Sequence, residues 1–305
     1  MSISHWGLAL LIVLGWGLNF VVIRFGLDEL TPMLLGGLRF LVVAIPAVFF
    51  IKPPKMPLKW LLGYGLTISF GQFALLFTAM HLGMPAGLAS LVLQSQMLFT
   101  MIFALLLLGE RWHLPQLISL VVASIGLVFL ASATPATEMT LVGFLLTIAA
   151  AASWGLGNIV TRRIGQMDGV NLMSVVVWGA LIPPIPFFLL SWWLEGPEMI
   201  SQSLASVGWK SVGVLVYLAT VATLFGYGCW SFLMSRYPAS TVAPLTLLVP
   251  VVGLLAAWIV LGESLSLSQG IGIVLILLGL MINVFGQNLR LKRRLRRMGI
   301  DKPEI

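Results

Sequence analysis

The chain has 305 residues, of which 59% are hydrophobic and only 9% are charged, and its mean hydropathy is +1.06. A soluble domain carries about 25% charged residues and about 45–50% apolar residues. So few charges cannot cover a water-exposed surface, and we expect most of the chain to lie in a lipid bilayer. The composition therefore excludes a soluble enzyme and a nucleic-acid-binding protein, in spite of the net charge of +7.

Ten apolar runs follow one another along the chain, each close to the ~20 residues that a helix needs to cross the hydrocarbon core. They cover residues 5–27, 31–51, 58–80, 85–109, 113–131, 140–162, 172–194, 208–234, 239–262 and 267–287. The widest gap, 195–207, has room for a loop or a short surface helix. The sequence predicts an all-α integral membrane protein with ten transmembrane helices. Met1–His5 lacks basic residues, so we expect no cleavable signal peptide.

Lysine and arginine residues are distributed unevenly over the connections. If the N-terminus is cytoplasmic, fourteen of them lie on the cytoplasmic side, including seven between Arg290 and Lys302. Lys210 alone then lies in an outer loop. Cytoplasmic connections carry an excess of basic residues. We therefore expect both termini in the cytoplasm, with a basic cytoplasmic tail at 288–305.

The second half of the chain repeats features of the first. Residues 85–91 align with 238–244 at an offset of 153, and the same offset pairs the Leu-Gly-Glu sequences at 108–110 and 261–263. Two repeats are expected from this pattern, at 5–131 and 140–287. Because each would hold five helices, an odd number, the two must have opposite orientations in the membrane. Inverted repeats are typical of secondary transporters, which bind substrate between the repeats near the bilayer midplane.

Several motifs resemble a known family. Trp16-Gly17-Leu18-Asn19, Pro32 with Arg39-Phe40, and the Gly-Glu endings of the fourth and ninth spans are similar to the drug/metabolite transporter superfamily, EamA type. The resemblance implies two five-helix EamA repeats and the export of small metabolites. Four stretches are most similar to bacterial inner-membrane exporters of O-acetylserine and cysteine: 16–23, 61–77, 83–96 and 243–254. This similarity implies location in the bacterial inner membrane.

Polar side chains inside the apolar runs are the candidate substrate contacts. Such groups are costly in lipid, so they face the bundle interior, either joining helices or forming a site. Trp16 and Asn19 share one helix face, and Trp154 with Asn158 repeats this arrangement in the second half. Gln72 and Tyr227 are further candidates.

Gln94 and Gln96 are only two residues apart. Either one of them lines the cavity while the other joins helices, or the helix is distorted there.

Arg39 is the most specific single charge, because a guanidinium can hold a carboxylate by two parallel hydrogen bonds. The alternative is that Arg39 pairs with backbone carbonyls or extends to the outer interface. Trp178 falls opposite Arg39 in the repeat alignment. The candidate substrate-binding residues are Trp16, Asn19, Arg39, Gln72, Gln94, Gln96, Trp154, Asn158, Trp178 and Tyr227.

Glu110 and Glu263 follow Leu-Gly at the ends of two spans. A carboxylate there either caps a helix N-terminus or acts at a hinge, or it takes part in coupling transport to protons. No Asp or Glu lies in the middle of a predicted span. Transport is therefore either coupled to protons through such groups at the span edges or not tightly coupled to protons at all. No His-Glu-x-x-His motif or cluster of acids is present, and we expect neither an enzyme nor a cofactor or metal. The predicted function is export of a small zwitterionic metabolite of the cysteine or O-acetylserine type. The alternative is export of other amino acids or of aromatic, drug-like solutes.

Overall fold

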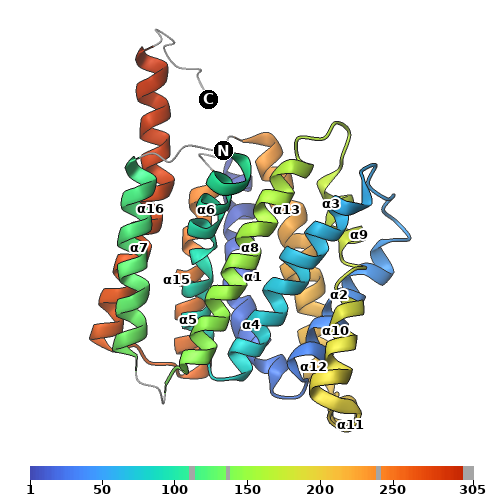
Figure 1. Cartoon of the computed structure of the whole chain (residues 1–305). Helices are drawn as coiled ribbons and strands as arrows, with labels where there is room; N and C mark the ends of the chain where they lie inside the picture. Colours follow the sequence, from blue (N-terminus) through green and yellow to red (C-terminus); the bar gives the residue numbers. More distant parts are fainter. Residues whose placement is uncertain (110–113, 135–137, 238–241, 298–305) are drawn as a thin grey trace.

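The protein is an all-helical bundle in the computed structural model, which describes residues 1–109, 114–134, 138–237 and 242–297 (Figure 1). Within these residues, seven helices are long and apolar enough to cross a membrane, and three shorter apolar helices lie at Pro32–Ala47, Leu245–Leu261 and Leu267–Ile282. These ten segments confirm the predicted ten-helix membrane protein. The seven long helices have 20 to 34 residues, which suffices to cross the hydrocarbon core at a rise of about 1.5 Å per residue.

The first half of the chain forms five membrane-spanning segments. They are α1 (Ile3–Leu27), α2 (Pro32–Ala47), the continuous run of α3 (Leu58–Tyr64), η1 (Gly65–Gly71) and α4 (Gln72–His81), the run of α5 (Ala86–Val92), η2 (Leu93–Ser95) and α6 (Gln96–Leu108), and α7 (Leu114–Ala133).

The second half forms five more. The first is α8 (Leu141–Ile164), and the second consists of α9 (Leu172–Gly179), α10 (Pro184–Leu190) and η3 (Ser191–Glu195), which leads into the short helix α11 (Gly196–Ala205). The third consists of α12 (Trp209–Val216), η4 (Tyr217–Phe225) and α13 (Gly226–Arg236). The fourth consists of η5 (Ala243–Leu247), α15 (Leu248–Ala256) and η6 (Ala257–Leu261), and the fifth is α16 (Leu267–Arg297).

Two structural details repeat at the offset found in the sequence. The third span of each half contains a π-helical segment, η1 in the first and η4 in the second. Gly109 and Gly262 end the fourth and ninth spans with nearly the same left-handed backbone, at φ of 66° and 68°. Glycine adopts this conformation without strain, which explains why the glycine of Leu-Gly-Glu occurs in both halves.

The two halves are inverted relative to each other. α7 and α16 pack side by side at one edge of the bundle and run in opposite directions (Figure 1). They approach closely because Gly126 lies against the backbone of Ile276 and Gly279 lies against Ala123. Small residues permit such close helix contacts in lipid. The N-terminus lies at one end of the bundle, which we call the N-terminal end, and the opposite end is called the distal end (Figure 1).

Candidate functional site

A cavity of about 380 Å³ lies inside the bundle, and residues of both halves line it. This volume falls within the range of small-molecule sites. Nine of the ten predicted residues line the cavity, namely Trp16, Asn19, Arg39, Gln72, Gln94, Gln96, Trp154, Asn158 and Tyr227. Sequence reasoning did not single out four other polar residues of the wall, Tyr64, Ser90, Thr161 and Thr246. Serine and threonine are hard to recognise because in helices they often bond their own backbone, as Ser90 does with Gly87.

Arg39 on α2 is a buried cation, with only 2% of its surface exposed. Its Nη2 donates a hydrogen bond to Thr223 Oγ1 at 3.2 Å, and its guanidinium carbon lies 4.0 Å from the centre of the Phe73 ring. Nε and Nη1 have no hydrogen-bond partner. Within the described part of the chain, no carboxylate forms an ion pair with it. Arg39 therefore neither reaches the interface nor pairs with backbone carbonyls, and its charge is only partly compensated.

An aromatic group forms a second part of the wall. Trp16 lies 5.5 Å from Tyr227 and 5.4 Å from Trp230, measured between ring centres. The Trp16 indole nitrogen also donates a hydrogen bond to the backbone oxygen of Ala222 at 3.0 Å. Ala222 lies in the π-helical segment η4, where the wider turn alters the backbone hydrogen-bonding pattern. Trp16 thus joins the two repeats and lines the cavity at the same time.

The amides at Gln94 and Gln96 both line the cavity because the helix is distorted between them. A short 3₁₀ segment, Leu93–Ser95, separates α5 from α6 and changes the direction in which successive side chains point. Gln96 Oε1 accepts a hydrogen bond from Asn158 Nδ2 at 2.6 Å, which connects the two repeats. Of the two alternatives drawn from the sequence, the structure has the distorted helix.

Trp178 does not belong to the described wall of the cavity, contrary to its expected role. Its indole nitrogen donates a hydrogen bond to the backbone oxygen of Ile51 at 2.8 Å. On the same helix, Val175 and Val176 line the cavity, and Trp178 lies beyond them. Trp178 therefore joins α9 to the connection after α2. The repeat alignment pairs it with Arg39 in sequence, but the two positions have different surroundings.

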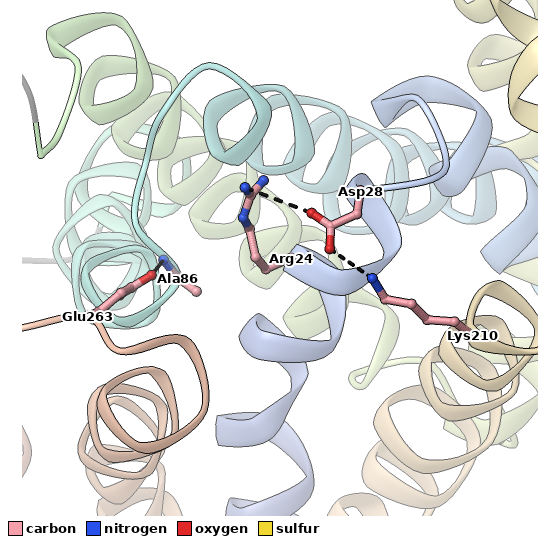
Figure 2. A network of polar contacts seen from close by, with 5 residues as sticks. All are labelled: Arg24, Asp28, Ala86, Lys210 and Glu263. Carbon is pink, nitrogen blue, oxygen red and sulfur yellow. Dashed lines mark hydrogen bonds and ion pairs between the residues drawn. The ribbon is translucent and has the colours of Figure 1, made fainter. Parts of the chain in front are cut away.

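Glu263 joins the two repeats at the distal end. Its carboxylate oxygens accept hydrogen bonds from the backbone nitrogens of Ala86 and Gly87, at 2.8 and 2.9 Å. Figure 2 shows this carboxylate beside Ala86. The negative charge thus lies at the N-terminus of α5, where the unpaired amides and the helix dipole stabilise it. Glu110, its counterpart in the first half, lies outside the described residues.

Glu195 makes a similar connection at the same end. Its Oε1 accepts a hydrogen bond from the backbone nitrogen of Met33 at 2.7 Å, and its Oε2 accepts from Thr31 Oγ1 at 2.6 Å. These contacts cap the N-terminus of α2, for which Thr31 itself supplies no side-chain cap. No pattern in the sequence indicated this residue, because its partners lie more than 160 positions earlier in the chain.

An ion pair completes the contacts between the repeats at the distal end. Lys210 Nζ lies 2.9 Å from Asp28 Oδ2, and Arg24 lies 3.8 Å from the other oxygen of Asp28 (Figure 2). Both partners of the Lys210 pair are partly exposed, so this contact contributes little by itself. None of these residues, nor Glu195 or Glu263, lines the cavity. The cavity wall instead extends to Thr161 and Leu172, which lie toward the N-terminal end, where α8 ends and α9 begins (Figure 1).

Known proteins match this chain over nearly its whole length. A protein of Salmonella typhimurium named "Probable amino-acid metabolite efflux pump" is 53% identical over 292 residues, which cover 95% of this chain and 98% of that protein. A protein of the same name from Escherichia coli K12 is 51% identical over 288 residues, with coverages of 94% and 96%. The more distant "Uncharacterized inner membrane transporter YedA" of E. coli K12 is 22% identical over 284 residues, with coverages of 90% and 88%.

A solved crystal structure has the same fold. It is 22% identical, covers 97% of this chain and 99% of its own, and superposes with a TM-score of 0.64. The model of the EamA-like transporter family matches the chain twice, over residues 5–132 and 141–285. Together with the relatives that are more than half identical, these two matches confirm the predicted family and show a transporter rather than an enzyme. The chain is a multi-pass membrane protein that belongs to the EamA-like transporter family.

Proposed function

We propose that this transporter exports small amino-acid metabolites of the cysteine and O-acetylserine type across the bacterial inner membrane by alternating access. Two relatives that match nearly the whole chain are named for amino-acid metabolite efflux. The observation that carries the substrate class is Arg39, a buried guanidinium in the cavity wall with two unpaired donor nitrogens.

The free donors of Arg39 indicate a carboxylate on the substrate. Removing a charge from water is costly unless an opposite charge or several hydrogen bonds replace the lost solvation. Thr223 and the face of Phe73 supply part of this compensation. A substrate carboxylate in the cavity supplies the rest, because it can accept one hydrogen bond from Nε or Nη1 and a second from the remaining N–H of Nη2, which lies beside both. The positive charge of Arg39 equally disfavours a purely cationic solute.

The distribution of basic residues supports a cytoplasmic N-terminus. The connection that holds Lys52 and Lys55 and the start of α3, which holds Lys59, lie at the N-terminal end of the bundle, as does the end of α8, which holds Arg162 and Arg163 (Figure 1). In this orientation the distal end faces the periplasm and is closed by the contacts of Glu195 and Glu263. The cavity then receives substrate from the cytoplasm, which is the loading step of an exporter.

Efflux from preloaded cells tests the proposal. Cells that express the chain and cells with an empty vector are loaded with labelled cysteine or O-acetylserine, and the rate of release is measured. We expect faster release with the chain and at least a tenfold loss of this gain in Arg39→Gln at equal membrane expression. Repeating the assay with an uncoupler, and with the cell energy level controlled, determines whether protons drive export.

Two results would contradict the proposal. If neither metabolite leaves faster while the protein is present in the membrane, the cysteine assignment is wrong, and release of other amino acids or of aromatic solutes identifies the alternative. Aromatic solutes are included because Trp16, Tyr227 and Trp230 offer ring faces on which such solutes can stack. If Arg39→Gln exports as fast as the unmodified protein, the carboxylate does not bind to Arg39.

A further inference from the structure

Unpaired buried polar atoms gather at the cavity. In the described part of the chain, six buried side-chain nitrogen or oxygen atoms have no hydrogen-bond partner. Four of them belong to three residues that line the cavity, namely Asn19, Arg39 and Gln72. Buried polar groups are almost always hydrogen-bonded, so such a concentration in one place needs an explanation. One explanation is a ligand that enters the cavity and supplies the missing hydrogen-bond partners.

The unpaired atoms are of two kinds. Arg39 has two free donors, whereas Asn19 Oδ1 and Gln72 Oε1 are free acceptors. The helices that carry these residues, α1, α2 and α4, contact one another, and all three residues line the same cavity. Gln72 is the first residue of α4 and directly follows the π-helical segment η1.

We propose that Asn19 and Gln72 form the binding site for the α-ammonium group of an amino-acid substrate whose carboxylate is held by Arg39. This inference rests on the proposed function and deepens it. None of the described residues that line the cavity is Asp or Glu, so a substrate cation is met there by neutral oxygen acceptors. A half-turn of each amide exchanges its oxygen and nitrogen, which lets the oxygen point to the ligand. The donors and acceptors together match a zwitterion.

Other amides of the wall are already engaged. Gln96 Oε1 accepts from Asn158, and Gln94 Nε2 donates to the backbone oxygen of Thr246 at 3.4 Å. These bonds join the helices, whereas Asn19 Oδ1 and Gln72 Oε1 have no partner, and each reaches a ligand in the cavity once its amide turns. This difference in hydrogen bonding distinguishes the amides of a ligand-binding site from amides that connect helices.

The test compares three thiols that differ only in their charged groups. Cysteine carries both the amino and the carboxylate group, 3-mercaptopropionate lacks the amino group, and cysteamine lacks the carboxylate. Binding of each is measured under a reductant to the purified full-length protein and to Asn19→Leu, Gln72→Met and the double variant. These replacements conserve side-chain volume but remove the polar atoms. Gln202→Met is the control, because it makes the same replacement at an exposed amide on α11 that is not among the described residues lining the cavity.

We expect the unmodified protein to bind cysteine at least tenfold more tightly than 3-mercaptopropionate, which corresponds to about 1.4 kcal/mol. In the double variant this ratio falls to within twofold of one, with 3-mercaptopropionate binding unchanged, whereas Gln202→Met keeps the ratio. The melting temperature of the ligand-free protein should not fall in Asn19→Leu, because removing an unpaired polar atom relieves a desolvation cost. A helix-joining role predicts a clear drop instead.

Three results would overturn the inference. Equal binding of cysteine and 3-mercaptopropionate to the unmodified protein removes the ammonium site while leaving the carboxylate site at Arg39 in place. A double variant that weakens both ligands equally, or that keeps the ratio, assigns Asn19 and Gln72 to the structure of the cavity. Failure of all three thiols and of O-acetylserine to bind refutes the proposed function, and with it the site that depends on it.

Discussion

Replacing Glu263 by glutamine should open the distal end of the bundle more often. The Glu263 carboxylate accepts hydrogen bonds from Ala86 and Gly87 and thereby joins the repeats. In alternating access this end must open, so contacts between the repeats have to break there. A hydrogen bond to a charged group contributes ~1.5–3 kcal/mol. Glutamine keeps one acceptor oxygen but loses the charge and the second acceptor, for an expected loss of about 2 kcal/mol, which is roughly a 30-fold shift toward the open form.

Thiol labelling from outside the cell measures this shift. Leu93 lines the cavity, so Leu93→Cys in a Cys229→Ser background places one thiol there. A membrane-impermeant thiol reagent added outside reaches it only when the distal end is open. We expect Glu263→Gln to raise the labelling rate at least tenfold. Glu198→Gln is the matched control, because Glu198 is an exposed acid at the same end, on α11.

The reasoning fails if Glu263→Gln labels within twofold of its parent, because the carboxylate then contributes nothing to closure. It also fails if Glu198→Gln has the same effect, because loss of any negative charge at this end would then suffice. Fast labelling in the parent protein would show that the cavity already opens to the outside, which would contradict a distal end that is closed toward the periplasm.

Three further predictions concern single residues. Arg39→Lys should restore only a small part of the export lost in Arg39→Gln, because lysine keeps the charge but cannot donate two parallel hydrogen bonds to one carboxylate; the efflux assay compares the two variants. Asn158→Leu should lower stability by ~1–3 kcal/mol, because it leaves the buried Gln96 Oε1 with only the long 3.5 Å contact from Thr100 Oγ1, and a melting curve in detergent checks this. Gly262→Ala should lower the melting temperature, because φ is +68° there, whereas Gly213→Ala, in a helix with open space around the Cβ position, should leave it unchanged or raise it.

The number of spans and the repeat were predictable because the bilayer imposes them. A helix must be about 20 residues long to cross the core, and this length is visible in the sequence as ten separate apolar runs. The repeat was predictable from spaced identities, and Gly109 with Gly262 shows the physical reason for one of them. Both residues adopt the left-handed backbone that only glycine tolerates well.

The candidate residues were predictable only as a group. Polar side chains in apolar helices avoid lipid, which explains why nine of the ten line one cavity. Trp178 shows the limit of the argument, because an indole also avoids lipid when it bonds a backbone oxygen such as that of Ile51. The contacts of Glu195 were not predictable, since a hydrogen bond between residues far apart in the chain leaves no local pattern.

The placement of charges connects substrate binding with the conformational cycle. Every carboxylate described at the junction of the repeats lies at the distal end, and the described wall of the cavity holds one cation and no acid. An empty cavity therefore leaves the Arg39 charge incompletely compensated, and a bound carboxylate removes this cost. A ligand shifts a conformational equilibrium only by the difference in its affinity for the two states. If Arg39 binds the carboxylate more strongly in one state than in the other, the free energy of that contact is available to bias the cycle, and a substrate without a carboxylate cannot supply it.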